Sequence, residues 1–141
     1  MKIQFVKLSE NASVPVKKSR DDAGYDLKSA IDYSLYPGEI RIIPTDISIA
    51  LAKGTFGMVV SRSGLASKGI VVNNAPGIID CNYRGNCGVI LRNQTDDIFN
   101  ISKGDRIAQL LVMPYFNVDW DEVPELDETS RGTGGFGSSG I

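Results

Sequence analysis

The chain has 141 residues, of which 42% are hydrophobic and 23% are charged, and its formal net charge at pH 7 is −2. This length suits one domain, and the apolar fraction is high enough to form a core and to exclude wholesale disorder. The nearly balanced charge argues against a nonspecific nucleic-acid binder, which normally carries a basic excess, so we expect no nucleic-acid partner.

Short runs of β-forming residues recur along the chain, and Gly, Pro, Asn and Asp are clustered between them. Runs of this length and spacing predict a β-sandwich or barrel. We expect a short helical turn over residues 63–68, since no long segment keeps the 3.6-residue apolar period of a helix. The predicted strands are residues 3–8, 39–43, 47–51, 56–60, 70–72, 87–92, 98–101 and 107–113.

The composition changes near the C-terminus. Residues 119–130 are mostly acidic or polar, and residues 131–140 have the sequence RGTGGFGSSG. A glycine-rich segment of this kind is usually a disordered terminus or linker. Here, however, an arginine opens the segment, Phe136 lies at its centre and two serines follow, and such groups bind phosphates and cover a base. We predict a folded domain over residues 1–125 and a mobile arm over residues 126–141 that becomes ordered over a bound nucleotide.

Histidine is absent, and cysteine occurs only as Cys81 and Cys87. The chain therefore cannot contain a Ser-His-Asp triad, a Cys-His pair or a histidine metal site. Two cysteines are too few for a closed thiolate zinc site, and we expect both to be free thiols that pack in an intracellular protein. An enzyme with this composition would use a carboxylate as proton acceptor and oxygen ligands for its metal, which favours Mg²⁺ and phosphates.

No apolar run approaches the length of a membrane span, and residues 1–13 lack the apolar core of a signal peptide. We therefore expect a soluble intracellular protein with no membrane partner. The sequence does not separate cytoplasm, nucleus and organelle.

Two early segments have both a structural and a chemical interpretation. Residues 23–27, AGYDL, fit a turn that enters a strand. Residues 61–66, SRSGLA, follow a β-run, and their glycine, hydroxyls and free N–H groups at a helix start suit a phosphate. Arg62 is able to bind a phosphate or to hold a carboxylate by two bonds. The alternative is a capped turn with an arginine on the surface.

The most specific segment is residues 74–88, NAPGIIDCNYRGNCG, which we interpret as a β-hairpin with an unusual tip. Asp80 lies between apolar neighbours there, so it is either chemically important or a solvent-facing residue of an edge strand. Residues 104–109, GDRIAQ, predict a turn into a buried strand. Gln109 in that strand either holds a water or a phosphate oxygen, or is an ordinary exposed residue.

Together with the tail, these segments resemble the five motifs of the trimeric dUTPase family, in order and with similar spacing over residues 23–140. The resemblance is to the eukaryotic and large-DNA-virus branches, and a viral chain would act in its host cell. It implies an all-β, distorted jelly-roll barrel or sandwich with at most one short helix and a flexible C-terminal arm. The implied activity is Mg²⁺-dependent hydrolysis of dUTP to dUMP and pyrophosphate, which limits uracil in DNA and supplies dUMP for dTTP synthesis.

The resemblance also implies a homotrimer with shared sites: one subunit supplies the first, second and fourth motifs, another the hairpin and the third the tail. Asp80 corresponds to the carboxylate that directs and deprotonates water for in-line attack at the α-phosphorus. Gln109 and Arg62 correspond to groups near the α-phosphate, and Asp26 to a carboxylate that reaches Mg²⁺ through water. The implied substrate-binding residues are Ser63 and Gly64 for phosphates, Gly77, Ile78 and Gly88 for uracil, Tyr83 for deoxyribose, Asn86 near the base, Phe136 for stacking, and Arg131, Gly137, Ser138 and Ser139 for the γ-phosphate.

Two positions depart from the family pattern: Ser61, where proline is usual, and Cys81-Asn82, where acidic or small polar residues are usual. Neither change removes a catalytic group. One alternative is a dCTP deaminase of the same superfamily, which Tyr83 and the complete tail argue against. Another is an inactive binding module, which would be expected to have lost part of the catalytic set. The last is a jelly-roll structural protein, which leaves Asp80 and the tail unexplained.

Overall fold

The structure is a computed structural model that describes residues 1–138. Within these residues the chain forms eleven strands and one four-residue helix. In chain order the elements are β1 (Gln4–Lys7), β2 (Tyr25–Lys28), β3 (Tyr33–Leu35), β4 (Ile40–Ile43), β5 (Ile47–Ala50), β6 (Thr55–Val60), α1 (Ser63–Ala66), β7 (Ile70–Val72), β8 (Gly77–Ile79), β9 (Val89–Asn93), β10 (Phe99–Ile101) and β11 (Arg106–Pro114).

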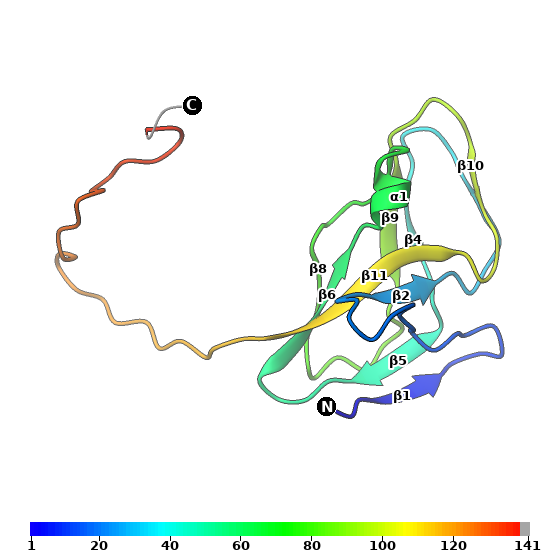
Figure 1. Ribbon diagram of the computed structural model, residues 1–141, viewed down its shortest axis with the longest axis horizontal. Coiled ribbons are helices and arrows are strands. Elements are labelled where there is room, and N and C mark those ends of the chain that lie inside the picture. Colours follow the sequence, from blue (N-terminus) through cyan, green and yellow to red (C-terminus); the bar gives the residue numbers. More distant parts are fainter. Residues whose placement is uncertain (139–141) are drawn as a thin grey trace.

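The strands pair antiparallel in four sheets that wrap around one core (Figure 1). The largest sheet has the order β2-β11-β6-β8, and a second has the order β4-β9-β7. Two-stranded sheets, β1-β5 and β10-β3, complete the body. Strands that pair are often distant in the sequence, as β11 and β2 are, which is typical of a jelly roll. The all-β jelly roll with one short helix is thereby confirmed.

The core follows the two-residue period of the strands. In β6 every second residue from Thr55 to Val59 is buried, because successive side chains point to opposite faces of a sheet. Burying one large aliphatic side chain contributes about 1.5–3 kcal/mol, so a continuous cluster of this kind dominates the stability of the body. The largest fully buried apolar side chains are Leu27, Leu35, Ile43, Ile47, Ile70, Leu91, Ile107 and Val89.

The prediction of a β-hairpin over residues 74–88 is wrong, because the two strands of this segment do not pair with each other. β8 pairs with β6, whereas β9 pairs with β4 and β7. The two strands therefore belong to different sheets, and residues 80–88, here called the crossover loop, pass from one sheet to the other. The physical reason is that each strand finds an open edge elsewhere: the outer edge of β6 accepts β8, and β9 fits between β4 and β7.

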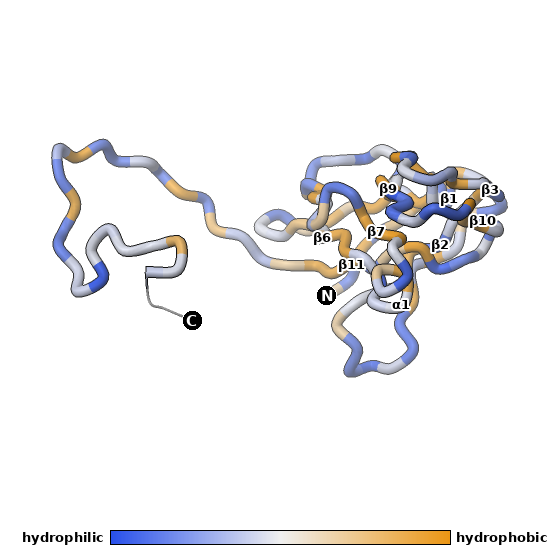
Figure 2. The backbone as a smooth tube through the Cα atoms, turned by 90° about the horizontal axis from the view of Figure 1, so that it is seen from above, coloured by the Kyte–Doolittle hydropathy of each residue, from blue (hydrophilic) through white to orange (hydrophobic). Residues whose placement is uncertain are grey.

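The chain leaves the body after β11. Residues 116–138, here called the arm, extend away from the sheets and are exposed over almost their whole length (Figure 1). The predicted boundary between domain and arm at residue 126 stays a prediction, as does the mobility of the arm. Figure 2 shows apolar positions spaced along it, and the side chains of Phe116 and Trp120 are 90% and 92% exposed. Among the helices within residues 1–138, none has the length and apolar character needed to cross a membrane.

Candidate active site

Asp26, in β2, is held by two arginines. Arg62 donates from Nε to Asp26 Oδ1 at 3.1 Å, and Arg106 donates from Nη1 to Oδ2 at 3.4 Å. The carboxylate is almost fully buried, and a buried charge of this kind needs charged partners to offset its lost hydration. Arg62 also donates from Nη1 to the Arg106 carbonyl at 3.1 Å, so one side chain links β2 to the start of β11. The three residues together keep one excess positive charge, which favours an anionic ligand.

Gln109 lies beside this cluster because β11 carries a bulge. The pairing of β11 with β2 shifts by one residue at Ile107, which places Gln109 opposite Asp26. A regular ladder would place Gln109 opposite Tyr25 and turn its side chain to the other face of the sheet. Gly24 leaves room for the amide, because a Cβ at this position would lie 3.1 Å from Gln109 Cδ.

The helix start next to Arg62 is open to solvent. Arg62 is the residue that precedes α1, and no side chain caps the helix and no acidic residue occupies its first turn. Ser63 and Gly64 are both exposed, and the space around Gly64 is empty. The structure therefore places Ser63 and Gly64 next to the arginine cluster, and their contact with phosphate stays a prediction.

A cavity of about 270 Å³ lies between the crossover loop, β8 and β4. Asp80 lines it and also lines a neighbouring hollow of about 550 Å³. The Asp80 side chain is exposed, and no group of residues 1–138 donates a hydrogen bond to its carboxylate. The cavity is lined by Ile42, Val59, Asn74, Gly77, Ile78, Ile79, Asp80, Tyr83, Asn86, Cys87, Gly88 and Ile90.

Within the crossover loop, Tyr83 folds back over the chain. Its hydroxyl donates to the Asn86 carbonyl at 3.1 Å, and Gly85 is required because a Cβ there would overlap the Tyr83 hydroxyl. The Asn86 side chain, which lines the cavity, is bonded to the turn at Thr45 and Asp46. Its Oδ1 accepts from the backbone N–H groups of Thr45 and Asp46, and its Nδ2 donates to Asp46 Oδ1. One amide hydrogen of Asn86 is left for a base, so direct contact through this side chain stays a prediction.

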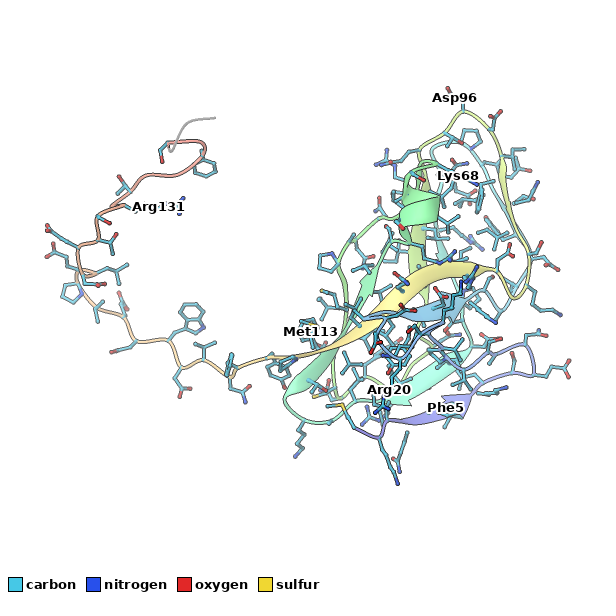
Figure 3. All side chains as sticks on the ribbon, in the orientation of Figure 1. Phe5, Arg20, Lys68, Asp96, Met113 and Arg131 are labelled. Carbon is cyan, nitrogen blue, oxygen red and sulfur yellow. The ribbon has the colours of Figure 1, made fainter. Side chains whose placement is uncertain are left out.

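In the same chain, the tail residues lie far from the arginine cluster and from the crossover loop. Figure 3 shows Arg131 on the arm, well separated from the body. Arg131 donates from Nε to the Gly134 carbonyl at 2.9 Å, and Phe136 is fully exposed. Gly137 has φ +90°, which favours glycine, and Ser138 is exposed. Ser139 lies outside the described residues.

Both cysteines are free thiols, as expected. Burial raises the pKa of the Cys87 thiol to about 11, so this group stays neutral in the core. Cys81 is half-buried beside Asp80, with its Sγ 3.8 Å from Tyr115 Oη. The contact with Cys81 raises the pKa of Tyr115, because it favours the neutral phenol.

Comparison with known proteins gives these groups a common context. A protein-family model described as dUTPase matches residues 10–140. The chain belongs to the dUTPase family. It is 49% identical over 140 residues to the human mitochondrial deoxyuridine 5'-triphosphate nucleotidohydrolase, covering 99% of this chain and 55% of the human protein. The mouse enzyme of the same name is 50% identical over 138 residues, covering 98% of this chain and 85% of the mouse protein.

Viral members of the dUTPase family match as well. The vaccinia virus (strain Copenhagen) enzyme of the same name is 47% identical over 139 residues, covering 99% of this chain and 93% of that protein. The Staphylococcus bacteriophage 80alpha dUTPase, solved with dUPNHPP, has a TM-score of 0.93 and 33% identity, covering 99% of both chains. A dUTPase mutant from phage phi11 of S. aureus, described with a structural Mg(II) ion, has a TM-score of 0.83 and 31% identity, covering 91% of this chain and 100% of that one.

The motif residues form three separate groups: the cavity at Arg62 and Arg106 shares no lining residue with the cavity at Asp80 and Tyr83, and the arm lies away from both. Asp26, Arg62 and Gln109 form the first, the crossover loop with Asp80 and Tyr83 the second, and the arm the third. Sequence reasoning assigned no role to Arg106, although this residue lies in a motif and also holds Asp26. It also missed the 45–48 segment that supports the crossover loop, since Pro-Thr-Asp between two β-runs indicates only a turn.

Proposed function

We propose that this chain hydrolyses dUTP to dUMP and pyrophosphate. The observation that carries this proposal is the Asp80 carboxylate, which has no hydrogen-bond partner within residues 1–138, at a cavity lined by Gly77 and Gly88 in a member of the dUTPase family. Close relatives named deoxyuridine 5'-triphosphate nucleotidohydrolase support the same activity. Removing dUTP would limit uracil in DNA and supply dUMP for dTTP synthesis.

The cavity supports recognition of uracil by main-chain groups. β8 is the last strand of its sheet, so the outer edge of Gly77–Ile79 keeps unpaired N–H and C=O groups. A pyrimidine edge that matches these groups binds, whereas cytosine has a reversed donor and acceptor pattern and leaves buried groups unpaired. The tight lining by Gly88 and Ile78 also disfavours the methyl group of thymine, and Tyr83 would pack against deoxyribose where a 2′-hydroxyl has no room.

Asp80 is the proposed proton acceptor. An ordinary aspartate is a weak base, but phosphoryl transfer depends mainly on position and on compensation of charge, so a well-placed weak base is sufficient. Because no group in the described part of the chain bonds this carboxylate, both oxygens are available to orient a water for in-line attack at the α-phosphorus. The bond to pyrophosphate then breaks as the bond to water oxygen forms.

The triphosphate would bind at the arginine cluster. Arg62 and Arg106 supply the excess positive charge, the Gln109 amide lies beside them, and Ser63 and Gly64 offer hydroxyl and N–H donors. The first role of Arg62 in this structure is to hold Asp26. A phosphate contact by Arg62 would add to that role and requires only its free guanidinium hydrogens.

The residues present fit Mg²⁺ that is carried mainly by the triphosphate. Residues 1–138 contain no group of three or more acidic or thiol side chains able to form a protein cage for a metal. Asp26 already accepts from two arginines, so it fits a contact to Mg²⁺ through water. The ion would neutralise phosphate charge, and Asp26 would orient its water ligands.

We propose a homotrimer with shared sites. In a single chain the arm does not reach the crossover loop, and the arm exposes large apolar side chains that usually become buried in an assembly. In the trimer, Phe136 of one subunit would cover the base held by another, while Arg131, Gly137, Ser138 and Ser139 would contact the γ-phosphate. We expect this enzyme inside the cell, in the compartment that holds its nucleotide substrate.

The test is pyrophosphate release from dUTP, dTTP, dCTP and UTP, each with and without Mg²⁺. We expect kcat/KM for dUTP to exceed that for each other nucleotide by roughly a hundredfold or more, because a polar site rejects the wrong partner strongly. Removing Mg²⁺ should lower the rate on dUTP. Comparable turnover of all four nucleotides would contradict the proposal, and ammonia released from dCTP would indicate a deaminase instead.

A further inference from the structure

We propose that Asp46 is a positioning residue that holds Tyr83 and the base cavity in place through Asn86. The inference rests on the proposed function, since it assigns a support to that same site. Asp46 is outside the five motifs and does not line the cavity. It follows β4 and directly precedes β5, in a turn that faces the crossover loop from behind.

The backbone of Asp46 is in the left-handed region, with φ +54°. Few residues other than glycine adopt this conformation, and aspartate and asparagine tolerate it best because their short side chains bond locally. Here the conformation turns the Asp46 N–H toward the crossover loop, where it donates to Asn86 Oδ1 at 3.0 Å. The Thr45 N–H donates to the same oxygen at 3.3 Å.

The Asp46 carboxylate completes a closed ring of bonds with Asn86. Asn86 Nδ2 donates to Asp46 Oδ1 at 2.7 Å, while Asn86 Oδ1 accepts from the Asp46 N–H. A bond to a charged acceptor is stronger than one to a neutral acceptor, so the carboxylate fixes which way the amide of Asn86 points. The side chain of Asn86 is thereby locked to the turn in a single orientation.

Because Asn86 is fixed in this way, it also fixes Tyr83 and Gly88, the two residues of the crossover loop proposed to contact a nucleotide. Its backbone carbonyl accepts from the Tyr83 hydroxyl at 3.1 Å and from the Gly88 N–H at 2.8 Å. Gly88 lines the cavity, and Tyr83 is the residue assigned to deoxyribose. A shift of Asn86 therefore moves both walls of the cavity together.

The other hydrogen bonds between the 45–48 segment and the crossover loop reach only the C-terminal half of that loop. Ser48 Oγ donates to the Arg84 carbonyl at 2.7 Å, and Thr45 Oγ1 donates to the Cys87 carbonyl at 2.9 Å. Residues 80–83, which carry Asp80 and Tyr83, have no such tie to the 45–48 segment. The tyrosine ring thus depends on the bond between its hydroxyl and Asn86, and so on Asp46.

The carboxylate offers a matched control, because its other oxygen has a different partner. Ser9 Oγ donates to Asp46 Oδ2 at 2.6 Å, on the side of the N-terminal segment and away from the cavity. Removing Ser9 takes away a hydrogen bond of the same carboxylate without touching Asn86. If Asp46 serves only general stability, loss of its bond to Ser9 and loss of its bond to Asn86 should both lower Tm and leave nucleotide binding unchanged. If Asp46 positions the cavity, only loss of the bond to Asn86 should weaken nucleotide binding.

The experiment compares Asp46→Gly, Asp46→Asn and Ser9→Ala with the wild-type chain, using KM and kcat for dUTP, Kd for dUMP and Tm. Glycine keeps the left-handed backbone and removes both side-chain bonds, so we expect KM and Kd to rise roughly tenfold with kcat changed about twofold or less. Asparagine tolerates the same backbone and still accepts from Asn86, so it should restore values close to wild type. Ser9→Ala should lower Tm and leave KM and Kd unchanged.

If Asp46→Gly and Ser9→Ala both lower Tm and neither raises KM or Kd, the positioning role is wrong. If Asp46→Gly does not fold, Tyr83→Phe breaks the same link at its other end and keeps the ring that would pack against deoxyribose. Tyr83→Phe should then raise the Kd for dUMP, and an unchanged Kd would overturn the inference. Turnover of dUTP by the wild-type chain tests the proposed function separately, since it depends on none of these variants.

Discussion

Replacing Asp80 with asparagine is expected to lower kcat for dUTP by roughly 10²- to 10⁴-fold, the usual contribution of a positioned general base. Asparagine has the same shape as aspartate but cannot accept the proton of an attacking water. Because the Asp80 side chain is exposed and holds no partner within residues 1–138, the change should leave the free energy of unfolding within about 0.5 kcal/mol of wild type.

Single-turnover rates and the Kd for dUpNHpp measured on the Asp80→Asn variant separate catalysis from binding. We expect slow chemistry with nucleotide affinity close to wild type. Asp97→Asn is a suitable control, since Asp97 is also exposed but lies in the turn between β9 and β10. Turnover near the wild-type rate in Asp80→Asn would remove Asp80 from the role of base.

Deleting residues 131–141 is expected to lower kcat/KM for dUTP by at least about a hundredfold while Tm stays near the wild-type value. The described part of this segment forms only local bonds, such as Arg131 Nε to the Gly134 carbonyl, so the body loses nothing on its removal. In the proposed trimer, loss of the tail would leave the phosphates in water and remove the arginine and the aromatic ring, and closure of this kind commonly completes a catalytic site.

A smaller change isolates one part of the tail. Phe136→Ala should weaken nucleotide binding by about 1–3 kcal/mol, which is the usual contribution of stacking one base on an aromatic ring. Trp120→Ala removes another exposed aromatic side chain of the arm outside the deleted segment, and it should leave base stacking intact. Equal losses of activity and thermal stability on deletion would show that the tail is structural.

The strands that the sequence predicted best are those with long apolar runs. Residues 107–113 and 56–60 became β11 and β6, the two central strands of the largest sheet. β2 and β8 were expected only as the strand after the 23–27 turn and as part of the 74–88 hairpin. β3 was not predicted, because Tyr33–Leu35 forms a strand through its pairing with β10 rather than through its own pattern. The same reason explains the wrong hairpin, since a run of β-forming residues does not reveal which sheet edge will accept it.

For the candidate site too, the sequence indicated individual residues but not how they come together. Motif residues such as Asp26 and Gln109 could be selected from the sequence, but their meeting depends on a one-residue bulge in β11 that no pattern indicates. Arg62 was expected at a phosphate, and the structure adds its bonds to Asp26 and to the Arg106 carbonyl. Asp46 gave no signal, because its importance comes from a backbone angle and from Asn86, forty residues away in sequence.

A mixed trimer gives the most direct measurement of a site shared between subunits. Asp80→Asn chains and chains lacking residues 131–141 are refolded together at equal concentrations, and turnover of dUTP is compared with each variant alone. If the crossover loop and the tail of a site come from different subunits, each mixed trimer regains one complete site and about a quarter of wild-type activity returns. Activity that stays at the level of the separate variants, in trimers shown to be mixed, would contradict the shared site.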